Sequence, residues 1–152
     1  MINHNNFWKK FYRLKKPPVN NSKFSKFCLK YLKNYSGNVF DLGCGNGRDT
    51  IFFHKNNINC YGLDQIQIII NKNKKRYKRY KNFFLRKNFS SINFDKISKE
   101  RYSIYSRFSL HSINFKQEKK FIDNLIKSKK LDYILIETRT IHDELYGVGK
   151  KI

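Results

Sequence analysis

The sequence predicts a single α/β domain built on a doubly wound, mostly parallel sheet. Three observations support this fold class: short apolar runs alternate with amphipathic segments, a glycine-rich turn follows the first such run, and a β-branched apolar run occupies residues 131–136. Strands that alternate with helices form parallel sheets covered by helices on both faces. A chain of 152 residues has the length of one domain. We expect residues 1–21 to form an N-terminal arm and residues 22–152 the domain itself.

The first helix is expected directly after the arm. Pro17-Pro18 blocks helix continuation and predicts a turn there. From Ser22 onward the apolar residues follow a helical spacing, and Ser22 is placed to cap the helix. These apolar residues are Phe24, Phe27, Cys28, Tyr31 and Leu32. The helix should end near Gly37.

The rest of the chain continues the alternation of strand and helix. The expected strands are 38–42, 59–63, 82–86, 102–106 and 131–136, and the expected helices between them are 48–56, 66–80 and 118–128. The last strand is apolar throughout, which is typical of a central parallel strand buried on both faces. The alternation then stops, whereas sheets of this kind commonly have one or two further strands, so we expect a sheet truncated after its fifth strand.

The chain is strongly basic, with 33 Lys and Arg against 11 Asp and Glu and a net charge of +22. A field of that size attracts polyanions such as nucleic acid. A second explanation is codon usage, because A/T-rich codons specify the abundant Lys, Asn, Ile, Phe and Tyr, and the basic residues are spread along the whole chain. The densest run, from Lys72 to Lys81, is most simply the solvated face of a helix. A nucleic-acid partner therefore stays an alternative.

The cysteines and the hydropathy pattern limit the compartment and the ligands. Cys28, Cys44 and Cys60 have no CxxC spacing and no histidines at metal-ligand intervals, so we expect neither a disulfide framework nor a metal site. No stretch reaches the ~18 uncharged apolar residues of a membrane span, and Trp8 and Lys9 stand where a signal peptide would have its apolar core. We expect a cytoplasmic protein with no membrane partner.

The segment with the most chemical information is Asp-Leu-Gly-Cys-Gly-Asn-Gly-Arg-Asp at 41–49, where the first strand turns into the next helix. Glycines at 43, 45 and 47 permit positive φ and let a ligand approach the backbone, while the helix directs free amides at it. A dinucleotide fingerprint would require glycine at position 48, which is Arg48, so the spacing disfavours NAD. A second acid, Asp64, ends the second strand 17 residues after Gly47. It is placed to accept hydrogen bonds from ribose hydroxyls, or is simply a turn residue.

Asp-x-Gly-x-Gly-x-Gly from Asp41, together with Asp64, resembles class I S-adenosylmethionine-dependent methyltransferases. The resemblance implies a Rossmann-like fold, S-adenosylmethionine as the cofactor, and methyltransferase activity. It implies that the glycine loop meets the methionine part, Asp64 the ribose and Gln65 the adenine. Asn88, followed by Phe89, stands where the family often has an acid or amide for the adenine amino group. The implied cofactor-binding residues are Asp41, Gly43, Cys44, Gly45, Asn46, Gly47, Asp64, Gln65, Asn88 and Phe89.

Two further motifs follow the fourth and fifth expected strands. A Tyr-x-Arg-Phe-x-x-His element occupies 105–111, and a Glu-x-Arg-x-x-x-Asp-x-x-Tyr-Gly element occupies 137–147. Both resemble a methyltransferase subgroup related to tellurite-resistance-type enzymes and to those found with capsule and surface-polysaccharide genes. The arm is similar to that subgroup as well, through Trp8, Tyr12 and 22–24.

Candidate catalytic residues come from these two motifs: His111, Arg107, Glu137, Arg139 and Asp143. Methyl transfer to a hydroxyl needs a base, and a histidine with its unperturbed pKa of ~6.5 is suited to that role. The alternative for His111 is a histidine packed against the sheet. The two arginines pair with the two acids, orient an anionic acceptor, or contact the cofactor carboxylate. In the arm, Trp8, Tyr12 and Phe24 either form a lid or simply pack.

Three functions are consistent with these residues. The first is methyl transfer to oxygen of a small or sugar-like acceptor. The second is an RNA or DNA methyltransferase, favoured by the charge but lacking an Asn/Asp-Pro-Pro-Tyr-like element after the fourth strand. The third is a shortened domain that binds S-adenosylmethionine without turnover. The sequence does not fix an oligomeric state.

Overall fold

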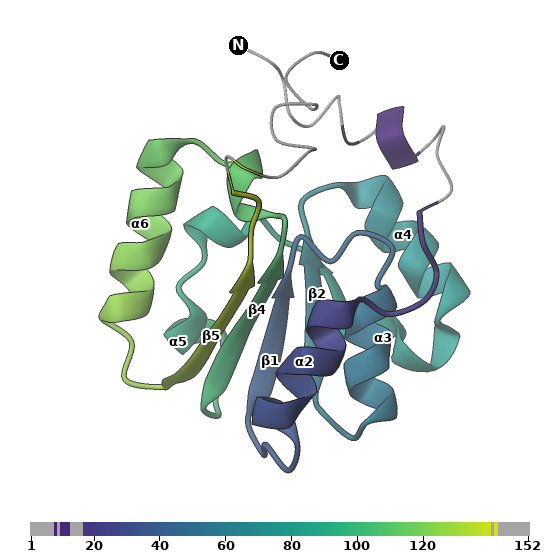
Figure 1. The fold of residues 1–152 in the computed structure, drawn as a ribbon, viewed down its shortest axis with the longest axis horizontal. Helices are drawn as coiled ribbons and strands as arrows, with labels where there is room; N and C mark the ends of the chain where they lie inside the picture. Colours follow the sequence, from purple (N-terminus) through teal and green to yellow (C-terminus); the bar gives the residue numbers. More distant parts are fainter. Residues whose placement is uncertain (1–7, 9, 13–16, 141, 143–152) are drawn as a thin grey trace.

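The computed structural model describes residues 8, 10–12, 17–140 and 142, and Figure 1 shows their arrangement. A sheet of five parallel strands lies at the centre, in the order β3-β2-β1-β4-β5. The strands are β1 (Asn38–Leu42), β2 (Cys60–Asp64), β3 (Phe84–Arg86), β4 (Tyr102–Arg107) and β5 (Leu131–Glu137). The predicted α/β class with a parallel sheet is confirmed. The boundary between a 1–21 arm and a 22–152 domain stays a prediction.

Helices cover both faces of this sheet. They are α2 (Lys23–Leu32), α3 (Arg48–Lys55), α4 (Gln67–Arg76), α5 (Phe94–Ile97) and α6 (Phe115–Ile126), with short 3-10 turns η1 (Lys78–Phe83), η2 (Phe89–Ser91) and η3 (Leu110–Ser112). On one face, α2 and α3 bury Leu32 and Phe53 against Val39. On the other face, α5 and α6 bury Phe94 and Phe121 in a second core. The sheet is therefore doubly wound.

The strand order reverses between β1 and β4, because the chain runs outward to β2 and β3 and then returns to the other side of β1. Leu42, the last residue of β1, is in register with Leu63 of β2 and Ser106 of β4. The carboxyl ends of these strands thus meet at one edge of the sheet. In open parallel sheets, ligands bind at such a switch point.

Capping side chains determine where two of the helices begin. The Ser22 side chain accepts a hydrogen bond from Ser25 N (2.9 Å), as expected of the N-cap of α2. The predicted 118–128 helix instead begins at Phe115, because Asn114 and Gln117 form a reciprocal capping box. That pair was readable in the sequence as a helix start.

The expected helix 66–80 is divided in the structure. Regular α-helix ends at Arg76, and η1 continues the chain with three residues per turn. This geometry places Tyr77 and Tyr80 on the same side, and their rings stack on Phe84 (5.8 Å between centroids) and His54 (4.9 Å). Because η1 extends through Phe83, β3 begins only at Phe84, two residues later than expected.

The expectation that 131–136 is a central strand buried on both faces is wrong. β5 lies at the edge of the sheet and pairs with β4 alone among the described residues. Tyr133 and Ile134 are 42% and 45% exposed. An apolar β-branched run indicates that a strand forms, but which neighbours it acquires depends on the whole chain.

The structure bears on three expectations, which concern disulfides, metal binding and membrane-spanning helices. Cys28, Cys44 and Cys60 are all buried free thiols. Among the described residues, no group of His, Cys, Asp and Glu is arranged to hold a metal ion. In the same part of the chain, no helix is long and apolar enough to cross a membrane.

Candidate functional site

A cavity of about 410 Å³ lies at the carboxyl ends of β1, β2 and β4. The glycine loop, the turn after β2, the turn after β4 and the arm together enclose it. Its walls include nine of the ten predicted cofactor-binding residues: Asp41, Gly43, Cys44, Gly45, Asn46, Asp64, Gln65, Asn88 and Phe89. Arg107 and Arg139, predicted from the two later motifs, also line it. Residues 41–49 and 105–111, far apart in sequence, are therefore brought together.

The glycine loop has the conformation that its residues permit. Gly43, Gly45 and Gly47 all have positive φ, between 52° and 74°. A Cβ on Gly43 would lie 2.7 Å from Ser109 Cβ, so the loop could not pass the turn after β4 with a larger residue. Gly47 does not line the cavity. A Cβ there would lie 2.6 Å from Phe84 Cε1, so its role in the structure is close packing at the start of α3.

Asp64 joins the glycine loop to the turn after β2. Its Oδ2 accepts a hydrogen bond from Gly45 N (3.2 Å) and its Oδ1 accepts one from Ile66 N (2.9 Å). The side chain is buried, and burial raises the pKa of Asp64 to about 6. Asp64 is thus a turn residue that also lines the cavity, and its contact with a ribose stays a prediction.

Asp41 and Asp49 add two more carboxylates to the same wall. Thr50 Oγ1 donates to Asp41 Oδ2 (2.6 Å), and burial together with the charge of Asp49 raises the pKa of Asp41 to about 7. Asp49 accepts hydrogen bonds from Ser22 N (2.7 Å) and Tyr105 Oη (2.8 Å). Sequence reasoning missed Asp49, although an acid in the first turn after the loop was visible. Three buried carboxylates at one end of a cavity favour a ligand with cationic groups.

Asp41 yields a prediction about stability and pH. Its pKa in the folded protein is raised above the unfolded value of ~3.9, so its contribution favours folding below pH 4 and is lost as the pH rises through about 7. Asp41→Asn, which keeps an acceptor for Thr50, should raise the free energy of unfolding at pH 8 by up to about 4 kcal/mol, which corresponds to the shift of the Asp41 pKa from ~3.9 to about 7. At pH 4 the gain should disappear. Urea unfolding of both proteins at the two pH values measures this, and an equal gain at both would contradict it.

Asn88 lines the cavity at the end of β3. Its Oδ1 accepts hydrogen bonds from Ser90 N (3.1 Å) and Ser90 Oγ (2.8 Å), because Asn88 is the N-cap of η2. Both lone pairs of that oxygen are thereby used. An adenine amino group would have to displace one of these contacts.

The two later motifs meet around Phe108. Arg107 Nε lies 2.5 Å from Glu137 Oε2 in an ion pair. The guanidinium carbons of Arg107 and Arg139 lie 4.4 Å and 4.7 Å from the centroid of the Phe108 ring. Phe108 itself has a φ of 53°, which is uncommon for a bulky residue and marks local strain. Arg107 and Glu137 thus form one of the ion pairs that the sequence suggested between an arginine and an acid. Asp143, Tyr146 and Gly147 of the second motif lie outside the described residues.

His111 lies in η3 on the rim of the cavity. Its side chain is exposed, so it is not a histidine buried against the sheet. Its ring centroid is 6.5 Å from that of Trp8, which lines the cavity. His111 itself does not line the cavity as the structure has it.

The arm closes one side of the cavity through Trp8, Phe11 and Tyr12. The Tyr12 hydroxyl lies against Gly45, and burial together with the charge of Asp64 raises the pKa of Tyr12, so the phenol stays protonated. Lys72 Nζ donates to Tyr12 O (3.2 Å) and ties the arm to α4. Phe24, the third predicted lid residue, instead stacks on Tyr105 in the core (5.3 Å).

Comparison with known proteins places this geometry in a family. A family model described as "Tellurite resistance protein TehB" matches residues 1–144. No curated protein matches the chain. A solved phosphoethanolamine N-methyltransferase 1 from Haemonchus contortus, in complex with phosphoethanolamine and S-adenosylhomocysteine, is 19% identical with a TM-score of 0.72, over 91% of this chain and 32% of that one.

Two other solved structures have the same fold. The glycopeptide N-methyltransferase MtfA, complexed with S-adenosylmethionine, is 14% identical with a TM-score of 0.61, over 75% of this chain and 51% of that one. The N-methyltransferase NodS from Bradyrhizobium japonicum WM9, in complex with S-adenosylhomocysteine, is 17% identical with a TM-score of 0.62, over 86% of this chain and 68% of that one. The chain thus spans about half the length of MtfA and about a third of the Haemonchus enzyme.

Proposed function

Because the chain belongs to the TehB family and has the class I methyltransferase fold, we propose that it binds S-adenosylmethionine and transfers the methyl group to oxygen of a small or sugar-like acceptor. The family membership confirms the predicted resemblance to tellurite-resistance-type methyltransferases. The observation that carries the proposal is the cavity at the switch point, where the glycine loop and Asp64 meet.

The cavity residues fit this cofactor chemically. When bound, S-adenosylmethionine supplies an electrophilic methyl group on a sulfonium, and its amino acid part carries an ammonium group. The buried carboxylates of Asp41, Asp49 and Asp64 suit these cationic groups. We assign the methionine part to the glycine loop, the ribose to Asp64, and the adenine to the turn of Gln65 and Ile66.

The acceptor side of the proposal rests on the two arginines and on His111. Arg107 and Arg139 line the cavity beyond the glycine loop and supply planar donors for an oxygen-rich acceptor. His111, exposed at the rim beside Trp8, would take the proton of an acceptor hydroxyl. His111 is not among the residues that line the cavity, so the proposal requires the acceptor to enter from the rim.

A thermal-shift comparison tests the cofactor. S-adenosylhomocysteine at ~100 times its dissociation constant should stabilise the protein by ~2.7 kcal/mol, whereas NAD should have no effect. A shift with NAD and none with S-adenosylhomocysteine would refute the proposal. Binding of S-adenosylhomocysteine without turnover on any hydroxyl acceptor would favour a non-catalytic binding domain.

We also propose that the protein works in the cytoplasm. Three buried free thiols, with no disulfide among the described residues, suit a reducing compartment.

A further inference from the structure

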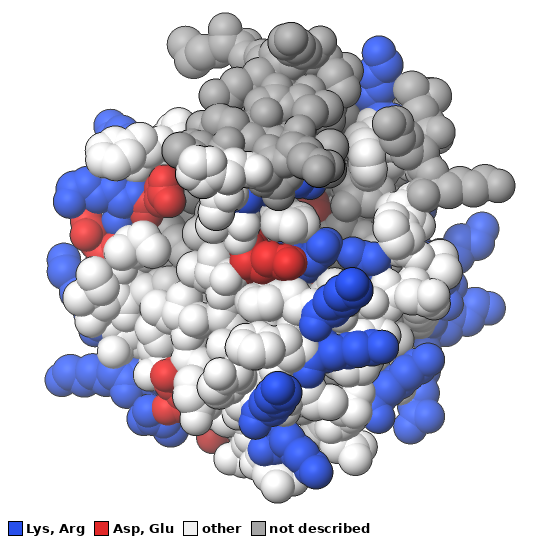
Figure 2. All heavy atoms as spheres, viewed as in Figure 1, with Lys and Arg blue, Asp and Glu red and all other residues white. Residues whose placement is uncertain are grey.

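Charge is distributed unevenly over the described surface. Residues 50–94 contain ten Lys and Arg, all exposed, and one acid, Asp64, which is buried. Residues 95–140, a segment of similar length, contain eleven Lys and Arg but also six Asp and Glu. In Figure 2 the red acidic atoms lie on the left and in the centre of the visible face, and the right-hand side is blue without red.

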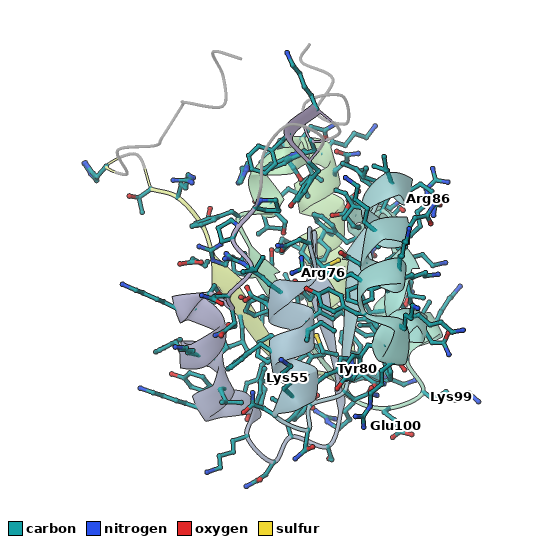
Figure 3. All side chains as sticks on the ribbon, turned by 90° about the vertical axis from the view of Figure 1, so that its right-hand side faces the viewer. Lys55, Arg76, Tyr80, Arg86, Lys99 and Glu100 are labelled. Carbon is teal, nitrogen blue, oxygen red and sulfur yellow. The ribbon has the colours of Figure 1, made fainter. Side chains whose placement is uncertain are left out.

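The ten cations form one surface, which we call the α4 basic face. Figure 3 looks onto it, with Lys55, Arg76 and Arg86 labelled on α3, α4 and β3. Its members come from the end of α3, from α4 and η1, and from the end of β3 and the residue after it: Lys55, Lys72, Lys74, Lys75, Arg76, Lys78, Arg79, Lys81, Arg86 and Lys87.

None of the ion pairs found among the described residues involves a cation of this face. The three ion pairs found among the described residues, Arg101–Asp132, Arg107–Glu137 and Lys119–Asp123, all lie in 95–140. On the α4 basic face, two guanidiniums lie instead over tyrosine rings, Arg76 over Tyr77 (5.3 Å) and Arg79 over Tyr80 (5.7 Å). Stacking restrains a guanidinium and leaves its N–H edge for an oxyanion.

The face reaches the rim of the cofactor cavity. Arg86 Nε donates to Gln65 O (3.4 Å), and Lys72 Nζ donates to Tyr12 O (3.2 Å). Both Gln65 and Tyr12 line the cavity. A long anionic ligand on the face would therefore run past the cavity mouth.

We propose that the α4 basic face binds the phosphate backbone of a nucleic acid. Exposed, uncompensated Lys and Arg release counterions when they neutralise phosphates, and this supplies affinity without base recognition. Tyr77 and Tyr80 are already stacked on Phe84 and His54, so the contact is with backbone and not with bases. A membrane surface fits less well, because Ile68 is the one large hydrophobic residue exposed in the described 50–94 segment, and interfacial helices insert an apolar face. This binding is independent of which acceptor the enzyme methylates.

Two variants with the same net charge test the location of the binding. Lys74, Lys75, Lys78 and Lys81 are changed to Gln in the first, and Lys116, Lys120, Lys127 and Lys129, exposed on α6 and just after it, are changed to Gln in the second. Affinity for a labelled, unstructured 20-nucleotide RNA is measured by fluorescence anisotropy at several salt concentrations. S-adenosylhomocysteine binding is measured in both variants to verify that each is folded.

The first variant should bind RNA at least tenfold more weakly at 0.15 M salt, and the second less than threefold more weakly. The slope of log affinity against log salt should fall by up to about 3 in the first variant, at about 0.7 for each phosphate that is no longer neutralised. An equal weakening in the two variants would show that diffuse charge, not this face, attracts RNA, and would overturn the proposal. Binding to phosphatidylserine vesicles with none to RNA would overturn it as well. Neither outcome affects S-adenosylhomocysteine binding, so the proposed function is judged separately.

Discussion

His111→Ala is expected to lower turnover by ~10²- to 10⁴-fold while S-adenosylhomocysteine affinity stays nearly unchanged, because a positioned base contributes that much to rate and nothing to cofactor binding. The exposed position of His111 means that the substitution removes little packing, so the melting temperature should change little. Steady-state kinetics with a hydroxyl acceptor, calorimetry with S-adenosylhomocysteine, and thermal unfolding are measured on one preparation.

The pH profile separates a base from a binding contact. The wild-type rate should fall as the pH is lowered and the base becomes protonated, and the residual rate of the variant should not show that inflection. A normal rate in the variant would remove His111 from the mechanism.

Asp64→Ala should weaken S-adenosylhomocysteine binding by roughly 1 to 3 kcal/mol, or about 5- to 150-fold, because two ribose hydroxyls would lose a charged acceptor. The substitution also removes the acceptor of Gly45 N and Ile66 N, so a lower melting temperature is expected. Calorimetry at a temperature below the unfolding transition measures the affinity for S-adenosylhomocysteine separately from the loss of stability.

Asp64→Asn is the control for this double role. The amide keeps an acceptor oxygen for one of the two backbone N–H groups but loses the charge, so it should recover part of the stability and little of the affinity. Unchanged affinity in both variants would mean that Asp64 acts only as a turn residue.

The sequence predicted the fold better than the details of the site. Periodicity located all five strands and the alternation of helices, because burial imposes these patterns on short stretches. The position of a strand within the sheet could not be predicted from the strand's own residues. Leu131–Glu137 is an edge strand despite its apolar run. Helix 66–80 was misjudged for a similar reason, since packing of Tyr77 and Tyr80 on distant rings selected the 3-10 turn.

In the site, motifs with fixed backbone requirements were the most predictable. The glycine loop and Asp64 adjoin one cavity because the strand-to-helix turn places them there. Contacts between distant segments were not predictable. Neither the contact of two guanidiniums with the ring of Phe108 nor the hydrogen bonds of Asn88 with Ser90 could be inferred from spacing.

The hydrogen bonds around Asp49 have a consequence for how the protein forms during synthesis. Asp49 binds Ser22, 27 residues earlier, and Tyr105, 56 residues later, while Ser22 Oγ and Tyr105 Oη, 83 residues apart, lie 3.2 Å from each other. Contacts of such sequence separation form slowly, since a long loop must close before they contribute. Tyr105 lies on β4, so it can contact Ser22, before α2, and Asp49, in α3, only after β4 has left the ribosome. A nascent chain that ends before β4 lacks these two contacts.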